Sequence, residues 1–191
     1  MKPFVILLLA TLPTFSPSAS GTDDTRLARS RALADQLQTA LSQRLMATMA
    51  DGGPVTAIDV CREEAPEIAA RISAEAGAHV RRTGLRVRNP ANTPDADARR
   101  VLESFDARMR RGDAPPLETF EAKADGSARY MRTIVLQPMC AACHGTDIAA
   151  PVAAAIAVEY PNDRATGFAP GDLRGAFIVD WAAGDTPRIR R

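Results

Sequence analysis

The sequence predicts an α+β domain in which helices come first and an antiparallel sheet follows. Near the N-terminus, apolar residues recur every four positions, which is typical of an amphipathic helix: Leu33, Leu37, Leu41, Leu45 and Met49. Two later stretches, 117–138 and 173–181, are rich in residues that favour strands. The first stretch contains Asp125-Gly126, a pair typical of a hairpin turn. A hairpin and a late strand predict an antiparallel sheet with the N-terminal helices packed against it.

The first part of the chain predicts a series of helices. The first helix follows Asp23-Asp24 and ends at Gly52-Gly53. Pro54 then suits the first turn of a second helical segment, because its fixed φ is close to the helical value. Pro66 lacks a backbone donor, so we expect it to split that segment into two short helices. Gly77 is expected to end the series.

The middle and the end of the chain predict strands and short helices in alternation. Residues 79–87 alternate and contain β-formers, which predicts a strand. Residues 89–94 predict a turn that leads into a helix over 94–111. An Ala-rich segment, 151–158, predicts another short helix, and 160–172 predicts a loop before the final strand.

The N-terminus has the features of a secretory signal peptide. Lys2 provides a positive start, Phe4 to Leu12 are apolar, and small residues precede Gly21. We expect a signal peptide over 1–20, cleaved near Ser20-Gly21, and one domain over 21–191. The alternative, an uncleaved N-terminal anchor, is disfavoured because the apolar stretch is too short to span a bilayer. We therefore expect a periplasmic or secreted protein without stable membrane insertion after cleavage.

The charge of the chain argues against nucleic acid as the main partner. Lys and Arg together number 24, and Asp and Glu number 23. Removal of Lys2 with the signal peptide leaves 24 − 1 = 23 basic residues against 23 acidic residues. A formally neutral protein has no general electrostatic attraction for a polyanion.

The segment C-A-A-C-H, residues 140–144, is the attachment pattern for a c-type haem. On a helical turn, positions i, i+3 and i+4 face the same way. The thiols of Cys140 and Cys143 can then add to the two haem vinyl groups, and His144 can bind the iron from the same side. The predicted export agrees with this interpretation, because c-type haem is attached outside the cytoplasm. We expect one covalently bound haem c.

Three other uses of this segment are less favoured. A zinc site needs a fourth ligand and usually has a second Cys or His pair. A thioredoxin-like pair needs a parallel βαβ framework, which the predicted elements do not provide. A disulfide between Cys140 and Cys143 leaves His144 without a role.

The ligand on the other side of the iron must come from upstream or be absent. No Met or His follows His144, so the layout of the ordinary small electron-carrying cytochromes is excluded. Cys61 would be left unpaired in an oxidising compartment, which makes it one candidate. His79 is the other, and spacing alone ranks the two evenly. Met46 and Met49 rank behind them.

Four stretches together resemble the family of soluble, single-haem c-type cytochromes built on a PAS-like sensor fold. They are 57–66, 82–94, 139–145 and 160–179, and the resemblance extends over about 55–181. It implies a PAS-like α+β domain whose haem is held by Cys140 and Cys143. It also implies iron ligation by His144 and, unusually, by Cys61.

These expectations lead to a functional hypothesis of redox sensing or one-electron transfer. A thiolate ligand favours ferric iron, so we expect a low reduction potential. Five arginines near the strand and turn or in the late loop are candidate contacts for the haem propionates, and Arg88 and Arg164 are preferred: Arg81, Arg82, Arg86, Arg88 and Arg164. For at least half of them, a solvated basic strand face is the favoured alternative. We expect a separate redox or signalling partner protein, which the sequence does not identify.

Three alternatives carry different functions. The first is a sensor that binds NO, CO or O₂ at an open or exchangeable distal site. The second is a four-helix bundle like cytochrome c-prime, which the predicted strands disfavour. The third is a haem peroxidase, but no His-Arg pair has the spacing of a peroxidase distal site, so we expect no enzymatic activity.

Overall fold

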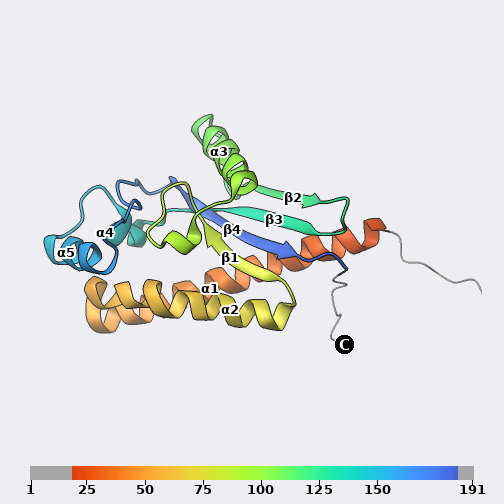
Figure 1. The fold of residues 1–191 in the computed structure, drawn as a ribbon. Helices are drawn as coiled ribbons and strands as arrows, with labels where there is room; N and C mark the ends of the chain where they lie inside the picture. Colours follow the sequence, from red (N-terminus) through yellow and green to blue (C-terminus); the bar gives the residue numbers. More distant parts are fainter. Residues whose placement is uncertain (1–18, 185–191) are drawn as a thin grey trace, which may run out of the picture.

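The computed structural model describes residues 19–184 and has four antiparallel strands in the order β1-β4-β3-β2. Two helices, α1 and α2, cover one face of the sheet, and α3 covers the other (Figure 1). The predicted α+β class with an antiparallel sheet and packed N-terminal helices is thus confirmed. Residues 1–18, most of the predicted signal peptide, lie outside the described range. Within 19–184, no helix combines the length and apolar character needed to cross a bilayer.

The N-terminal helices agree with the prediction at Gly53 and Gly77, whereas α1 begins at Ala19, before the predicted start after Asp23-Asp24. Helix α1 runs over Ala19–Asp59 with a kink at Gly53, whose φ of 73° is not helical, and it resumes at Pro54. Helix α2 covers Ala65–Ala76 and ends at Gly77 with a left-handed φ of 67°. A side chain at Gly53 or Gly77 would be strained in this conformation, which explains the two glycines.

A π-helical turn, η1, joins α1 and α2 over Val60–Glu64. The amide of Ala65 donates to the carbonyl of Val60, five residues earlier. Pro66 follows directly and has no amide hydrogen for the carbonyl of Arg62. The backbone hydrogen bond therefore spans five residues instead of four, as in other π-helical turns. Such turns occur frequently at functional sites. Cys61 lies in this turn.

The central strand of the sheet is β4, Leu173–Trp181, which pairs with β1, His79–Thr83, and with β3, Ala128–Val135. Strand β2, Glu118–Ala122, completes the predicted hairpin with β3. The bounds of β4 match the prediction, whereas β1 ends at Thr83, earlier than the predicted residue 87. At this point the Thr83 hydroxyl donates to the carbonyl of Asn92, and the chain turns out of the sheet.

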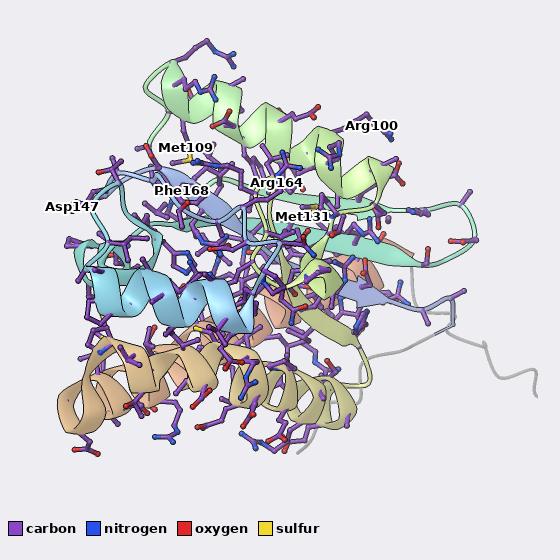
Figure 2. All side chains as sticks on the ribbon, turned by 60° about the vertical axis from the view of Figure 1, so that its left-hand side comes forward. Arg100, Met109, Met131, Asp147, Arg164 and Phe168 are labelled. Atoms are coloured by element: carbon purple, nitrogen blue, oxygen red, sulfur yellow. The ribbon has the colours of Figure 1, made fainter. Side chains whose placement is uncertain are left out.

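Alternation along β4 places apolar side chains on both faces of the sheet. Phe177, Val179 and Trp181 belong to the core under α1 and α2. Ala176 and Ile178 belong to the core under α3, Ala96–Arg110. Met131 and Met109 lie between α3 and the sheet in Figure 2. Burial on both sides explains why β4 is almost continuously apolar.

The remaining elements gather at one end of the sheet. A 3₁₀ turn, η3, covers Pro138–Cys140 and continues into the short helix α4, Ala141–His144. Helix α5, Ala150–Glu159, lies beside α4 and the end of α1 (Figure 1). Another 3₁₀ turn, η2, covers Pro90–Asn92 within the predicted turn. These elements and the turn η1 enclose the space described next.

Candidate functional site

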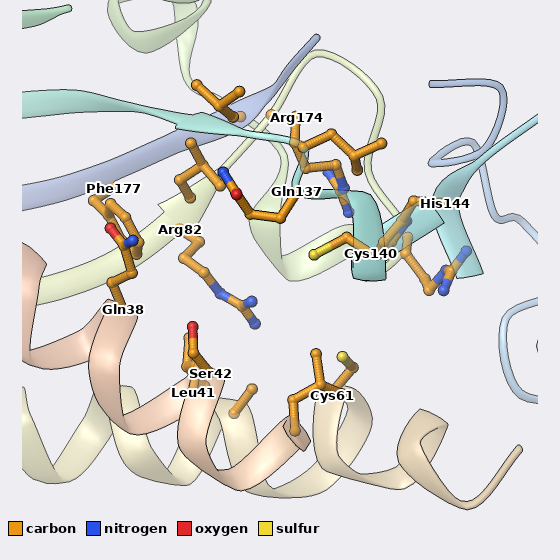
Figure 3. A pocket seen from close by; sticks show the side chains of 18 of the residues that line it. Gln38, Leu41, Ser42, Cys61, Arg82, Gln137, Cys140, His144, Arg174 and Phe177 are labelled. Carbon is orange, nitrogen blue, oxygen red and sulfur yellow. The ribbon is translucent and has the colours of Figure 1, made fainter. Parts of the chain in front are cut away.

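A cavity of about 590 Å³ lies between the helical layer and the end of the sheet. Cys61 lines it from η1, and Cys140, Cys143 and His144 line it from η3 and α4. Figure 3 shows Cys61 on one wall, with Cys140 and His144 on the wall facing it. The fold thus brings Cys61 to the same cavity as Cys140 and Cys143, which lie far downstream in the sequence.

The two cysteines of the C-x-x-C-H segment are half-buried free thiols. Cys140 packs against Leu136, Ala165 and Phe168, and Cys143 packs against the cluster formed with α5. Burial raises the pKa of both thiols, and the proximity of Cys61 raises it further. The thiols are therefore held in their neutral form in a partly apolar setting.

The ring of His144 is fixed by one hydrogen bond. Its Nδ1 lies 2.6 Å from the carbonyl oxygen of Ala165. A carbonyl can only accept, so Nδ1 carries the hydrogen and Nε2 has a free lone pair. Burial lowers the pKa of His144 to about 2, and Arg174 and Arg88 lower it further in the same direction. The imidazole is thus neutral, which is the form that binds a metal.

The loop 160–168 is bound to the C-x-x-C-H turn along its length. The amides of Phe168 and Gly167 donate to the carbonyls of His144 and Gly145, at 3.0 and 2.8 Å. Asp163 accepts from the amide of Ala165 at 2.8 Å, which fixes the carbonyl that holds His144. The predicted loop therefore has a defined role, because it orients the imidazole.

Gly145 follows α4 directly, and the backbone at this position leaves no space for a side chain. A Cβ at this position would lie 2.5 Å from the carbonyl oxygen of Ala141. The amide of Gly145 donates to that same oxygen at 2.8 Å, which closes the turn directly after His144.

The structure separates the candidates for the ligand opposite His144. Cys61 lines the cavity, whereas His79 is exposed at the start of β1 and lies outside the cavity lining. The alternative of His79 as a ligand is therefore incompatible with its position. Met49 also lines the cavity, but Met46 is 56% exposed and does not. Of the two leading candidates, only Cys61 is placed to act from the wall facing His144.

Of the two arginines preferred as propionate contacts, Arg88 lines the cavity and Arg164 does not. Arg88 lines the cavity, but its charge is paired with Asp163 at 2.9 Å, and it also donates to the Cys143 carbonyl at 2.6 Å. Arg164 is exposed in the loop and lies outside the cavity lining. Three further arginines line the cavity: Arg82, Arg132 and Arg174. Arg174 was not predicted as a site residue, although its charge within a largely apolar strand was a signal for one.

The residues present fit an iron porphyrin. The cavity is within the usual size of a cofactor pocket. Its donor set combines two neighbouring thiols, an oriented neutral imidazole and a third thiol opposite. A bare metal ion fits less well, because within residues 19–184 no three His, Cys, Asp or Glu side chains form a cluster that could hold one.

Comparison with known proteins agrees with this assignment. The model of the Tll0287-like family matches residues 19–181. The chain belongs to the Tll0287-like family. All four stretches that carry the sequence resemblance lie within the matched residues, so the resemblance to this group of haem-binding cytochromes is confirmed.

A solved relative of the Tll0287-like family has a similar structure. It is described as the cyanobacterial haem protein Tll0287. The two chains are 28% identical with a TM-score of 0.64, and the match covers 87% of this chain and 98% of the other. No curated protein matches the chain.

Proposed function

We propose that this chain is an exported single-haem c-type cytochrome that acts in redox sensing or one-electron transfer. Cys140 and Cys143 would hold the haem through thioether bonds, and His144 and Cys61, which lie on facing walls of the cavity, would supply the iron ligands. The observation that carries the proposal is the placement of Cys61 across the cavity from the C-x-x-C-H turn. The description of the 28% identical relative as a haem protein supports it.

When bound, the haem supplies an iron that exchanges one electron, and this chain's residues set its properties. The Ala165 carbonyl accepts the Nδ1 hydrogen of His144, and the other ring nitrogen, Nε2, is therefore directed away from the loop. Cys61 contributes a negative charge when it is a thiolate, which stabilises the oxidised state and lowers the reduction potential. The partly buried walls limit access of water to the site. This strengthens both the hydrogen bond that orients His144 and the effect of the Cys61 charge on the iron.

A gas-coupled sensor is the second candidate function. The π-helical turn that carries Cys61 favours it, because such turns interrupt regular helices and occur frequently at functional sites. Release of Cys61 on reduction would open a position for CO or NO. Exposure of the ferrous protein to CO tests this function, because a shifted optical spectrum would show that the position opens.

The intact mass of the exported protein tests the proposed function most directly. We would produce the full chain in a bacterial host that attaches c-type haem, and extract the periplasmic protein with acidic acetone. We expect cleavage near Ser20-Gly21 and a mass increase of one haem. Conversion of Cys140 and Cys143 to Ala should abolish that increase, whereas Cys61→Ser should retain it. A wild-type protein with the mass of the bare polypeptide would refute the proposal.

A further inference from the structure

Two arginines line the cavity from neighbouring strands. Arg82 lies on β1, and Arg174 lies near the start of β4, which pairs with β1. Figure 3 shows the guanidinium groups of both residues within the cavity region, Arg82 between the two walls and Arg174 above Cys140. Val80 packs in the core under α1 and α2, so the alternation of β1 places Arg82 on that same face, where the core ends and the cavity begins.

Among residues 19–184, neither arginine forms a hydrogen bond or ion pair with a carboxylate, although the charge of Asp163 raises the pKa of Arg174 to a smaller extent than burial lowers it. Within the described part of the chain, no hydrogen bond or ion pair involves the side chain of Arg82, and Arg174 donates only to the Arg86 carbonyl, at 3.3 Å. The groups that raise the pKa of Arg82 are Cys61 and Tyr160, neither of which is a carboxylic acid.

Other arginines of the same sheet and of the cavity wall are paired. Arg129 and Arg81 each pair with Asp95 and Asp180. Of the cavity-lining arginines, Arg88 pairs with Asp163 and Arg132 lies 2.8 Å from Asp35. Arg82 and Arg174 are therefore exceptions in a sheet whose arginines generally have acidic partners.

The absence of acidic partners is electrostatically unfavourable. Burial lowers the pKa of Arg82, and burial together with Arg82 lowers the pKa of Arg174 to about 10. Both side chains are partly buried, and two cations close enough to affect one another in such a setting are stabilised by an anion between them. Two negative charges would neutralise them.

We propose that Arg82 and Arg174 form a binding site for a pair of carboxylates, and that these are the two haem propionates. This inference rests on the proposed function, because the haem is the ligand that carries them. A guanidinium binds a carboxylate through two parallel hydrogen bonds, so each arginine can take one propionate. The assignment replaces Arg164, which is exposed, and Arg88, whose charge is already paired.

Reversible binding of two probes tests the site. The full mature chain, with Cys140 and Cys143 changed to Ala so that no thioether forms, is titrated with haemin and with haemin dimethyl ester. The ester keeps the iron and the ring but has no carboxylate. We expect the chain to bind haemin at least about tenfold more tightly than the ester, because a charge-assisted hydrogen bond is typically worth that much.

Single variants assign this preference to residues. Arg82→Gln and Arg174→Gln should each weaken haemin binding by about tenfold and leave ester binding nearly unchanged. Arg82→Lys keeps the charge but not the two-pronged geometry, so it should retain part of the preference. The matched control is Arg81→Gln, which lies next to Arg82 on β1 and has acidic partners. It should leave the ratio of the two affinities unchanged. Circular dichroism verifies that each variant is folded.

Two results would overturn the inference. One is equal affinity for haemin and the ester in the chain that carries only the two cysteine substitutions. The other is a loss of affinity in Arg82→Gln and Arg174→Gln that is the same for both probes. Either result would leave the proposed function intact, since that function depends on the covalent haem mass measured separately.

Discussion

Asp163 and Arg88 form an ion pair at 2.9 Å, and each also holds the backbone on one side of His144. Their side chains are only 8% and 7% exposed. Arg88 donates to the carbonyl of Cys143, directly before His144. Asp163 accepts from the amide of Ala165, whose carbonyl receives the Nδ1 hydrogen of His144. One pair thus fixes both the turn that carries the imidazole and the rotation of its ring.

Removal of one member of this pair should destabilise the domain strongly. Asp163→Ala leaves Arg88 buried without its counter-charge, so we expect the free energy of unfolding to fall by about 3–5 kcal/mol. Urea unfolding followed by circular dichroism measures it. The control is Asp97→Ala, which removes an exposed partner of Arg100 and should cost less than about 1 kcal/mol. Similar losses in the two variants would contradict the role given to Asp163.

Replacement of Cys61 should change the iron spectrum. In Cys61→Ser we expect loss of the low-spin thiolate signal in the EPR spectrum of the ferric protein, because the position facing His144 then lacks a thiolate. His79→Ala is the control, since His79 lies outside the cavity lining, and its spectrum should equal that of the wild type. A thiolate signal that survives Cys61→Ser would exclude Cys61. If the thiolate signal is lost in His79→Ala instead, the placement of His79 outside the cavity is wrong.

A methyl group at Gly145 should disturb the attachment turn. The Cβ of Gly145→Ala would lie 2.5 Å from the Ala141 carbonyl oxygen, so the backbone must shift directly after His144. We expect a loss of about 1–3 kcal/mol in stability and a lower yield of haem-bound protein. The comparison variant is Thr146→Ala at the next position, where the side chain is exposed, and it should be nearly neutral. Equal yields from the two variants would argue against a tight turn.

Glu118 should make stability depend on pH in the acid range. Hydrogen bonds from Arg31 and from the Tyr130 hydroxyl, the latter at 2.7 Å, hold the pKa of Glu118 below its ordinary value of 4.5. Between the two pKa values the unfolded chain binds a proton that the folded chain does not, so stability rises with pH there. The contribution is complete above pH 4.5 and is lost as the pH falls through the lower, folded-state pKa.

Unfolding of Glu118→Gln as a function of pH checks this account. The variant should be less stable than the wild type near neutral pH, and the difference should shrink on acidification. Glu103→Gln provides the control, because Glu103 is exposed and has no hydrogen-bond or ion-pair partner among residues 19–184. A difference that stays constant down to acid pH would show that the Glu118 charge has no part in it.

Much of the fold was predictable because local chemistry determines it. Gly77 and Asp125-Gly126 lie at chain reversals where a positive φ or a short turn is required, and both predictions agree with the structure. The bounds of β4 were predictable because a strand buried on both faces is apolar throughout. The strand at 79–87 was predicted too long, because the turn after Thr83 depends on a contact with Asn92 that spacing does not reveal.

The site was predictable where spacing alone defines it. Cys140, Cys143 and His144 share one turn, so their common orientation followed from helical geometry. The distance of Arg164 and His79 from the cavity depends on how the loop and the sheet pack, which the sequence pattern does not encode. Arg174 reaches the cavity from the central strand, a placement that only the tertiary structure shows.

The positions of Cys61 and Cys140 have a consequence for the chain as a whole. They are 140 − 61 = 79 positions apart, and α2, β1, α3, β2 and β3 lie between them. In the proposed holoprotein, one prosthetic group anchored at both positions closes this segment into a ring, as a disulfide would. If the iron–sulfur bond persists in the denatured chain, the freedom that the chain loses contributes at most about 4.5 kcal/mol. Breakage of the iron–sulfur bond would open the ring, so the resistance of the entire domain to unfolding would follow its oxidation state.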